Sequence, residues 1–212
     1  MVNGLKIKLE GNVISVPYIE MTMQIMHEFG VNVNFENNEI DIRPQQYKPI
    51  EYNVESDWSA ASYWYEVLSV VGNGKIFLKG LYQNSSQGDS KIAELFEQLG
   101  VATEYVSDGV ILTSTRNFTK KFKYDFVNQP DMAQTFAVTC CLNNIPFHFK
   151  GVQSLKIKET DRVAALINEL KKLGYVLFEP QESELAWKGE RFEPLSDISI
   201  KTYEDHRMAM AF

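Results

Sequence analysis

The sequence repeats one structural plan, and this repeat narrows the folds that the chain can adopt. Three segments each begin with a short alternating stretch that is typical of a strand and that ends in a glycine. A polar loop, an amphipathic helix and another strand follow in each case. These segments start at Leu5, Lys75 and Pro146. Their helices are predicted to end at Phe29–Gly30, Leu99–Gly100 and Leu173–Gly174, where the glycine supplies a left-handed cap.

A second series of helices alternates with the first. Asp57, Asp131 and Asp205 each open an apolar, alanine-containing stretch, and the spacing is 74 residues in both intervals. Aspartate is a good N-cap, so each stretch is predicted to be a buried helix that begins at its aspartate. The repeating unit is therefore strand–helix–strand–helix–strand–strand. The predicted fold class is α/β (α+β), built from repeated β-α-β-α-β-β units.

The units divide the chain unequally. One copy is predicted over residues 51–113 and another over 122–188, while 1–43 holds the end of an earlier copy and 198–212 opens a new one. We therefore expect the chain to be a fragment of a longer protein. Stacked units bury their faces against one another, so a fragment is expected to expose apolar surface and to be prone to self-association.

Composition argues against several classes of protein. With 44% hydrophobic residues the chain can bury a core, and its longest apolar stretches are too short to span a bilayer. The net charge of −7 argues against a general nucleic-acid binder but not against a binder of small anions. Cys140 and Cys141 are adjacent, which suits neither a relaxed disulfide nor a metal site. We expect reduced core thiols, no metal and a cytoplasmic location.

The stretch KIKETDRVAAL crowds five charges in front of an apolar helix. Thr160 or Asp161 is the predicted N-cap, which places Lys158 and Glu159 before the helix and Arg162 in its first turn. A helix N-terminus favours an anion, and two added cations would strengthen a phosphate or carboxylate site. The alternative is a solvated helix start in which Lys158 pairs with Glu159.

The stretch YEDHRMAMAF places Arg207 beside His206 in the first turn of a helix that Asp205 caps. An arginine there opposes the helix dipole, which suggests that it is held for an external anion. The alternative is a surface pair between Arg207 and Asp205 or Glu204. Asp131 is either a plain N-cap, as the repeat symmetry favours, or a general base at a helix start.

Hydroxyl groups gather at two further helix starts. Ser15 and Tyr18 lie at a strand-to-helix turn, where they are predicted either to bind a phosphate or sugar-like ring or to satisfy turn and cap groups. The equivalent loop of the next repeat offers Ser85, Ser86 and Gln87, which we interpret as capping residues.

Together these loops resemble the 3-phosphoshikimate 1-carboxyvinyltransferase (enolpyruvylshikimate-phosphate synthase) family. The matching motifs are KETDR at 158–162, DHRMAM at 205–210, SVPYIEMT at 15–22, ESDWSAASY at 55–63, NSSQGD at 84–89 and PDMAQT at 130–135. The resemblance implies an inside-out α/β barrel of the enolpyruvyl transferase type, with a site in the cleft between two domains. Residues 1–50 would be the last unit of the first domain. Residues 51–212 would be most of the second, truncated at its C-terminal end.

The resemblance implies a transferase of the shikimate pathway, in aromatic amino acid biosynthesis. The enolpyruvyl group of phosphoenolpyruvate would pass to the 5-hydroxyl of shikimate 3-phosphate, with release of phosphate. Asp131 would be the general base, Glu159 its partner in proton transfer at the methylene carbon, and Lys158 would neutralise charge between the substrates. Neither a metal nor an organic cofactor is implied, because an acid–base pair and fixed positive charge can carry this chemistry.

The resemblance also implies two groups of substrate contacts. Those on the phosphoenolpyruvate side would be Arg162, Arg207 and His206. Those on the shikimate 3-phosphate side would be Ser15, Tyr18, Asp131, Lys158 and Ser154, the last at a position where the family commonly has asparagine. The family's other substrate-binding loops are absent from this sequence. We therefore expect little or no activity from the fragment alone, and a monomer from the full-length protein.

Two alternatives remain beside this interpretation. The first is a related enolpyruvyl transferase that acts on UDP-N-acetylglucosamine, which the pair of motifs KETDR and DHRMAM fits poorly. The second is a non-catalytic repeat or interaction module whose charged loops only cap helices. It predicts that charge reversal at Glu159 or Arg162 leaves turnover unchanged.

Overall fold

A computed structural model describes residues 3–212 of the chain. The helices are α1 (Val16–Glu28), α2 (Trp58–Val71), α3 (Ile92–Leu95), α4 (Ala133–Leu142), α5 (Arg162–Lys172) and α6 (His206–Ala211). Short 3-10 helices are η1 (Gly88–Lys91), η2 (Phe96–Gln98), η3 (Pro130–Met132) and η4 (Gln153–Ile157). The strands are β1 (Leu5–Lys8), β2 (Val33–Glu36), β3 (Glu39–Ile42), β4 (Lys75–Lys79), β5 (Leu99–Val106), β6 (Gly109–Phe118), β7 (Phe122–Asp125), β8 (Phe147–Lys150), β9 (Tyr175–Phe178) and β10 (Leu185–Arg191). Across residues 3–212, none of the helices combines the length and the apolar character that crossing a membrane requires.

The predicted repeat is confirmed most fully between residues 122 and 191. There the order is β7, α4, β8, α5, β9, β10, which is the complete strand–helix–strand–helix–strand–strand unit. Its four strands form one sheet in the order β7-β8-β10-β9. Strands β7 and β8 are parallel, as a crossover through a helix requires, and the other pairs are antiparallel.

The unit predicted over residues 51–113 departs from this plan at its start. Its sheet has three strands in the order β4-β6-β5, and residues 51–57 form no strand. One hydrogen bond of the expected strand pairing is present: the Ser56 N–H donates to the Gly80 carbonyl at 2.7 Å. The matching bond in the complete unit runs from the Phe126 N–H to the Lys150 carbonyl. The opening strand of this copy is thus reduced to a single sheet-like contact.

Most of the helix predictions hold. The amphipathic helix α5 and the helix α2 both start directly after a capping aspartate, as expected. Helix α2 is buried on one face only, because Trp64 and Val67 are exposed on the other. The helix predicted to end at Leu99 is irregular, because 3-10 turns η1 and η2 flank a single turn of α-helix, α3. Its apolar side chains are nonetheless buried, so the predicted inward face is correct.

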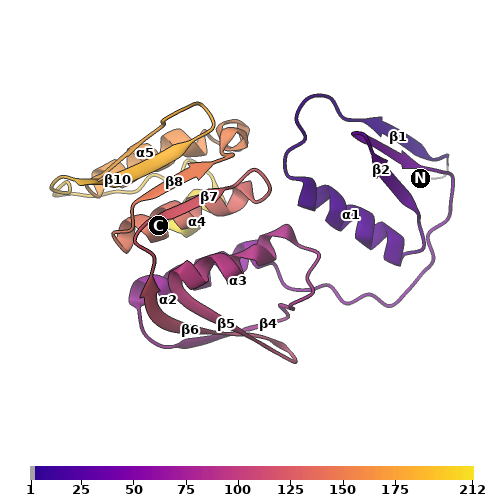
Figure 1. Cartoon of the computed structure of the whole chain (residues 1–212), viewed down its shortest axis with the longest axis horizontal. Helices are drawn as coiled ribbons and strands as arrows, with labels where there is room; N and C mark the ends of the chain where they lie inside the picture. The colour runs from indigo at the N-terminus through magenta and orange to yellow at the C-terminus, as the bar shows by residue number, and fades with distance from the viewer. Residues whose placement is uncertain (1–2) are drawn as a thin grey trace.

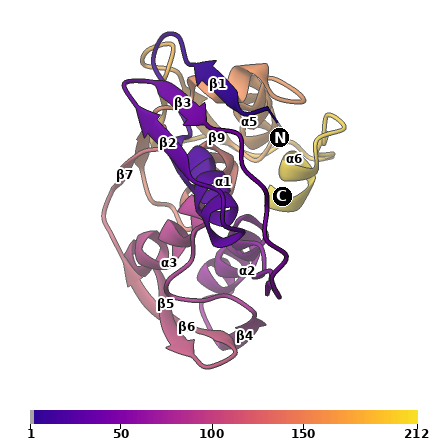
Figure 2. The ribbon, with the colours of Figure 1, turned by 90° about the vertical axis from the view of Figure 1, so that its right-hand side faces the viewer.

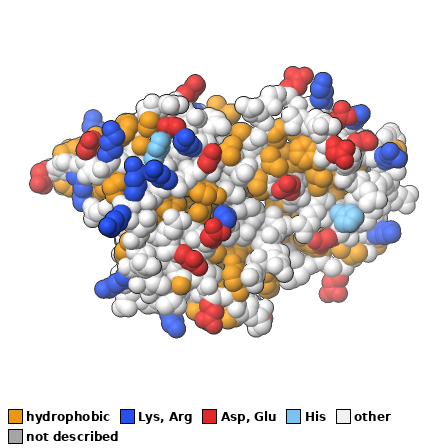
Figure 3. All heavy atoms as spheres, viewed as in Figure 1, with side chains coloured by type: hydrophobic (Ala, Val, Ile, Leu, Met, Phe, Trp, Pro, Cys, Tyr) orange, Lys and Arg blue, Asp and Glu red, His pale blue; other side chains and the backbone are white. Residues whose placement is uncertain are grey.

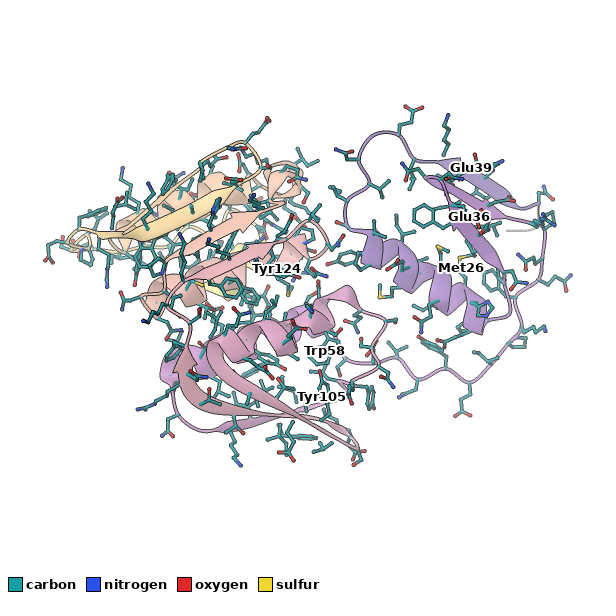
Figure 4. All side chains as sticks on the ribbon, viewed as in Figure 1. Met26, Glu36, Glu39, Trp58, Tyr105 and Tyr124 are labelled. Atoms are coloured by element: carbon teal, nitrogen blue, oxygen red, sulfur yellow. The ribbon has the colours of Figure 1, made fainter. Side chains whose placement is uncertain are left out.

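Helices lie inside the main body, which we define as residues 51–212, and sheets lie outside. Figure 1 shows α2 and α4 between the β4-β6-β5 sheet and the β7-β8-β10-β9 sheet. Aromatic rings fill the space around α4, where Phe136 contacts Phe96 at 4.6 Å and Phe122 at 5.3 Å between ring centroids. At the start of α2, the ring of Trp58 lies toward that of Tyr105 (Figure 4). Cys140 and Cys141 are free, buried thiols, as predicted.

The N-terminal body, which we define as residues 3–50, is a smaller layer. Its helix α1 packs on the sheet β1-β3-β2, and its only cluster of buried apolar residues within the described range is Val31, Ile40 and Ile42. The surface of this body is accordingly rich in apolar side chains (Figure 3). An apolar hollow opens between the helix and the sheet, and side chains such as Ile19 and Met26 line it. In Figure 2 the N-terminal body faces the viewer and lies in front of the main body.

Candidate active site

Two charged motifs lie where helices begin. Helix α5 starts after Asp161, whose carboxylate accepts a hydrogen bond from the Ala164 N–H at 3.0 Å. Helix α6 starts after Asp205, which caps it through the Arg207 N–H at 2.8 Å. These caps put Arg162 at the first position of α5, and Arg207 at the second position of α6. Both helix starts point their cationic side chains toward Asp131.

Asp131 does not cap a helix, and this corrects the expectation from repeat symmetry. It lies inside the 3-10 turn η3, and α4 begins two residues later with no side-chain cap. Its carboxylate instead faces three cations, two from the segment 158–162 and one from the start of α6. These are Lys158 at 3.5 Å, Arg162 at 3.1 Å and Arg207 at 3.4 Å. The matching aspartates of the repeat, Asp57 and Asp205, both cap their helices, so Asp131 is the exceptional member of the series.

Arg162 is the centre of this cluster. Its side chain is only 2% exposed, yet it contacts three carboxylates. Asp205 holds one edge of the guanidinium through Nε at 2.7 Å and Nη2 at 3.2 Å. The end of the guanidinium reaches Asp131 through Nη1 and Glu159 through Nη2. A buried arginine needs such a set of partners, because an unpaired buried charge is costly.

The electrostatics of the cluster follow from these bonds. Burial raises the pKa of Asp205, but the hydrogen bonds and charge of Arg162 together with the backbone N–H groups of Arg207 and Met208 outweigh it, so the pKa lies below its ordinary value. Burial lowers the pKa of Arg207, and the nearby Asp131 and Tyr63 more than offset this, so the net shift is upward. The alternative that Arg207 forms an exposed pair with its own loop is wrong, because its side chain is 14% exposed and faces Asp131.

Lys158 and Glu159 form the open side of the cluster. The side chain of Lys158 is 34% exposed and that of Glu159 is 51% exposed. They do not pair with each other, as the solvated alternative would require. Lys158 faces Asp131, and Glu159 accepts from Arg162 at 2.7 Å. A ligand that approached Asp131 from solvent would meet these two side chains first.

Ser15 and Tyr18 approach the cluster from the N-terminal body. The Ser15 N–H donates to the carbonyl of Val127 at 3.0 Å, close in sequence to Asp131, and its φ is 57°. Its hydroxyl does not cap α1. The Tyr18 hydroxyl donates to the buried carboxylate of Asp89. Burial and the charges of Asp89 and Asp131 raise the pKa of Tyr18, which places this hydroxyl within the field of the cluster.

The remaining two predicted site residues lie at its margin. Ser154 is buried in η4, and η4 packs against the turn η3 that carries Asp131. His206 is exposed at the start of α6, next to Arg207. The structure therefore brings together Asp131, Lys158, Glu159, Arg162 and Arg207 by direct contact, and leaves Ser154 and His206 beside them.

Sequence reasoning missed two carboxylates of this region. Asp205 was predicted as a cap, but its second role as the partner of buried Arg162 was not expected. Asp89 was not singled out, because its loop was interpreted as a capping loop around Ser85 and Gln87. The available signal was the motif NSSQGD, in which an aspartate directly follows a glycine at a helix start. A pattern of this kind does not say which distant hydroxyls will meet the carboxylate.

Comparison with known proteins places this arrangement in context. A family model described as EPSP synthase (3-phosphoshikimate 1-carboxyvinyltransferase) matches residues 1–212. A 3-phosphoshikimate 1-carboxyvinyltransferase of Bacteroides fragilis is 51% identical over 211 residues, which are 99% of this chain and 52% of that protein. One from Idiomarina loihiensis is 38% identical over 210 residues, or 96% of this chain and 47% of that protein. The chain thus spans about half the length of the curated relatives it matches.

Solved structures show the same fold at low sequence identity. An EPSP synthase from Acinetobacter baumannii superposes with a TM-score of 0.66 at 17% identity, covering 99% of this chain and 49% of that one. The enolpyruvyl transferase NikO from Streptomyces tendae gives a TM-score of 0.60 at 10% identity, covering 99% and 48%. The expected α/β fold of repeated units, of the enolpyruvyl transferase type, is confirmed by these two likenesses.

Proposed function

The chain belongs to the EPSP synthase (3-phosphoshikimate 1-carboxyvinyltransferase) family, and from this premise we propose that it carries the acid–base centre for transfer of an enolpyruvyl group from phosphoenolpyruvate to shikimate 3-phosphate. The observation that carries the proposal is the convergence of Lys158, Arg162 and Arg207 on Asp131. Asp131, the segment 158–162 and the start of α6 are far apart in sequence, and none of these contacts is needed to form a helix.

Each step of the proposed reaction needs a group that the cluster contains. The 5-oxygen of shikimate 3-phosphate attacks C2 of phosphoenolpyruvate while C3 takes up a proton. C3 then loses a proton as inorganic phosphate leaves, which restores the double bond. Asp131 would accept the proton of the 5-hydroxyl, and Glu159 would give and take the proton at C3. Lys158, Arg162 and Arg207 would stabilise the negative charge of both substrates.

Arg162 and Arg207 would serve the phosphoenolpyruvate side in different ways. Asp205 fixes one edge of Arg162, and the end of its guanidinium faces Asp131 and Glu159, where the substrates would lie. Within residues 3–212, Arg207 makes a single hydrogen bond to a carboxylate, at 3.4 Å to Asp131, so it has more capacity to hold a new anion. An arginine presents a fork that matches a carboxylate, which suits both residues to this role.

Ser15, Tyr18, Ser154 and His206 belong to the proposal as peripheral substrate contacts. The first two would meet shikimate 3-phosphate from the N-terminal body, and the motif relationship to the family supports this. We propose that residues 1–50 belong to one domain and residues 51–212 to the other, with the substrates between them. The Ser15–Val127 and Tyr18–Asp89 contacts support this division, because they lie where the two bodies meet.

The cluster itself is balanced in charge, which limits what the chain does alone. Its cations are Lys158, Arg162 and Arg207, and its carboxylates are Asp131, Glu159 and Asp205. Two highly anionic substrates at close range repel each other and need an excess of positive charge. We therefore propose that further cations come from the half of the relatives that lies outside the match, and that the 212-residue chain alone turns over little or no substrate.

A hybrid enzyme tests this function. The chain would replace the matching 211-residue part of the Bacteroides fragilis relative, with which it is 51% identical. We expect the hybrid to release phosphate only when both substrates are present, and the isolated chain to release little. Glu159→Gln in the hybrid should lower kcat by about 10²–10⁴-fold, the usual effect of losing an acid–base group. The matched control is Glu97→Gln, which makes the same change at an exposed glutamate outside the cluster.

The result separates the proposal from the alternative of a non-catalytic module. If the Glu159→Gln hybrid is as active as the unchanged hybrid, Glu159 is not part of the chemistry. If an unchanged hybrid that folds fails to release phosphate, the proposed function of the chain is wrong.

A further inference from the structure

One carboxylate near the cluster has no role in the proposed chemistry. Asp89 lies in η1 and is only 2% exposed, although a buried carboxylate is costly unless it accepts hydrogen bonds. It accepts from two hydroxyls. The Ser59 hydroxyl of α2 donates to Oδ2 at 2.5 Å, and the Tyr18 hydroxyl of α1 lies 3.2 Å from Oδ1 and 3.1 Å from Oδ2. Burial is the main reason that the pKa of Asp89 is raised.

The bond from Tyr18 joins two parts of the molecule. Tyr18 belongs to the N-terminal body, and Asp89 belongs to the main body. Over the described range 3–212, no other side-chain hydrogen bond or ion pair connects these bodies. The backbone bond from Ser15 to Val127 lies three residues before Tyr18. Few polar contacts therefore hold α1 over the main body, beside the ring contact between Phe29 and Tyr52.

The backbone beside Asp89 is shaped for this contact. A Cβ added at Gly88 would lie 2.4 Å from the Cβ of Pro17, so only glycine allows the first turn of α1 to approach this closely. Pro17 and Tyr18 are neighbours on α1, as Gly88 and Asp89 are on η1. The close backbone approach thus brings the tyrosine hydroxyl to the carboxylate.

We propose that Asp89 is a positioning residue: it fixes the ring of Tyr18 and thereby the orientation of the N-terminal body over the Asp131 cluster. This inference rests on the proposed function, in which Ser15 and Tyr18 contact shikimate 3-phosphate. Asp89 itself touches no reacting atom. Its effect passes through Tyr18, whose hydroxyl already lies in the field of Asp131.

The first test measures kinetics in the hybrid. Asp89→Asn keeps the shape of the side chain but weakens its capacity to accept two hydroxyls, and Tyr18→Phe keeps the ring but removes the hydroxyl. Each is expected to raise KM for shikimate 3-phosphate by about tenfold to a hundredfold, the scale of a misplaced substrate contact, and to leave KM for phosphoenolpyruvate unchanged. The double variant should be no worse than either single variant, because both remove the same interaction.

Tyr65→Phe is the matched control for loss of a tyrosine hydroxyl. Tyr65 bonds Thr103 at 2.7 Å inside the main body, so its change should lower stability without moving KM. A merely structural role for Asp89 predicts the same pattern for Asp89→Asn, namely lower stability and an unchanged KM. That pattern, or additive effects of Asp89→Asn and Tyr18→Phe, would overturn the inference.

The second test needs no activity. Spin labels on cysteines introduced at the exposed Glu36 and Glu97 report the distance between the two bodies, and both native cysteines are buried. We expect a narrow distance distribution in the labelled chain and a broad one after Asp89→Asn or Tyr18→Phe. Tyr65→Phe should leave it narrow. An unchanged distribution in both variants contradicts the positioning role even if the hybrid is inactive, whereas an inactive hybrid with broadened distributions counts against the proposed function only.

Discussion

Arg162 and Asp205 form a buried, two-point ion pair that ties the start of α5 to the start of α6, with Nε to Oδ2 at 2.7 Å and Nη2 to Oδ1 at 3.2 Å. Asp205 also caps α6 through the Arg207 N–H. One carboxylate therefore holds Arg162 in place and sets the position of Arg207. The two motifs that lie more than 40 residues apart in sequence act as one structural element.

Loss of this pair should destabilise the chain strongly. Asp205→Asn preserves shape and a capping oxygen but leaves Arg162 without its buried counter-charge, which should lower the free energy of unfolding by about 3–5 kcal/mol. Asp57→Asn is the control, because Asp57 caps α2 at the matching repeat position without an arginine partner. It should cost at most about 0.5 kcal/mol, since asparagine caps nearly as well. Urea unfolding of both variants measures the difference, and equal costs would contradict the role of the pair.

A pair of repeat-equivalent glycines separates backbone strain from crowding. Gly11 and Gly151 both have positive φ, 77° and 69°, where a side chain costs about 1–2 kcal/mol. A Cβ at Gly11 would meet no atom of the described residues within 4 Å, whereas one at Gly151 would lie 2.3 Å from the Val127 nitrogen and from Asp125 Oδ1. Gly151→Ala should therefore cost about 1–3 kcal/mol more than Gly11→Ala in chemical unfolding. Equal losses of unfolding free energy in the two variants would show that the backbone at Val127 moves away from the new Cβ at little cost.

The repeat in the sequence predicted the architecture because its signals are local. Alternation, helical periodicity and the terminal glycines depend on a few neighbouring residues, and they located α5, β8 and most other elements correctly. The opening strand of the 51–113 copy was not distinguished from an extended loop, because strand formation depends on pairing and not on the sequence of residues 51–57 alone. The irregular helix around α3 was missed for a similar reason, since its apolar spacing is that of a regular helix.

The candidate site was predictable only in part. The position of charged residues at helix starts indicated that Lys158, Arg162 and Arg207 bind an anion. The carboxylates that pair with them could not be predicted, because tertiary structure brings them together. Symmetry predicted that Asp131 caps a helix, and the structure shows that it does not. The contacts of Asp89 could not be predicted from the sequence, because the two hydroxyls that donate to it lie 30 and 71 residues away along the chain.

Glu66 should make the stability of the chain depend on pH. It lies buried in α2 with one carboxylate oxygen that finds no hydrogen-bond partner among residues 3–212, and burial raises its pKa well above the ordinary value. The folded state therefore holds this proton more tightly than the unfolded state does. Its contribution to stability is complete below the unfolded pKa, near 4.3, and falls by up to about 1.4 kcal/mol per pH unit until the folded pKa is passed.

Glu66→Gln removes this contribution and nothing else that titrates. The variant and the unchanged chain should unfold at similar urea concentrations near pH 4, and the variant should become the more stable one as the pH rises to 8. The difference between the two curves is the quantity to measure, because other groups contribute equally to both. Parallel curves from pH 4 to 8 would mean that Glu66 is ionised in the folded chain.

Arg207 offers the sharpest test of how the hybrid holds phosphoenolpyruvate. Arg207→Gln removes a charged fork, and a lost hydrogen bond to a charged group is worth about 1.5–3 kcal/mol, so KM for phosphoenolpyruvate should rise by about tenfold to a hundredfold. Arg207→Lys keeps the charge without the fork, so its KM for phosphoenolpyruvate should lie between those of the unchanged hybrid and the Arg207→Gln hybrid. KM for shikimate 3-phosphate should change less, because Arg207 is assigned to the phosphoenolpyruvate side of the site. Arg116→Gln, which removes an exposed arginine bonded to the Gly72 carbonyl, is the control. Equal KM values for phosphoenolpyruvate in the Arg207→Gln and Arg116→Gln hybrids would show that Arg207 only neutralises Asp131.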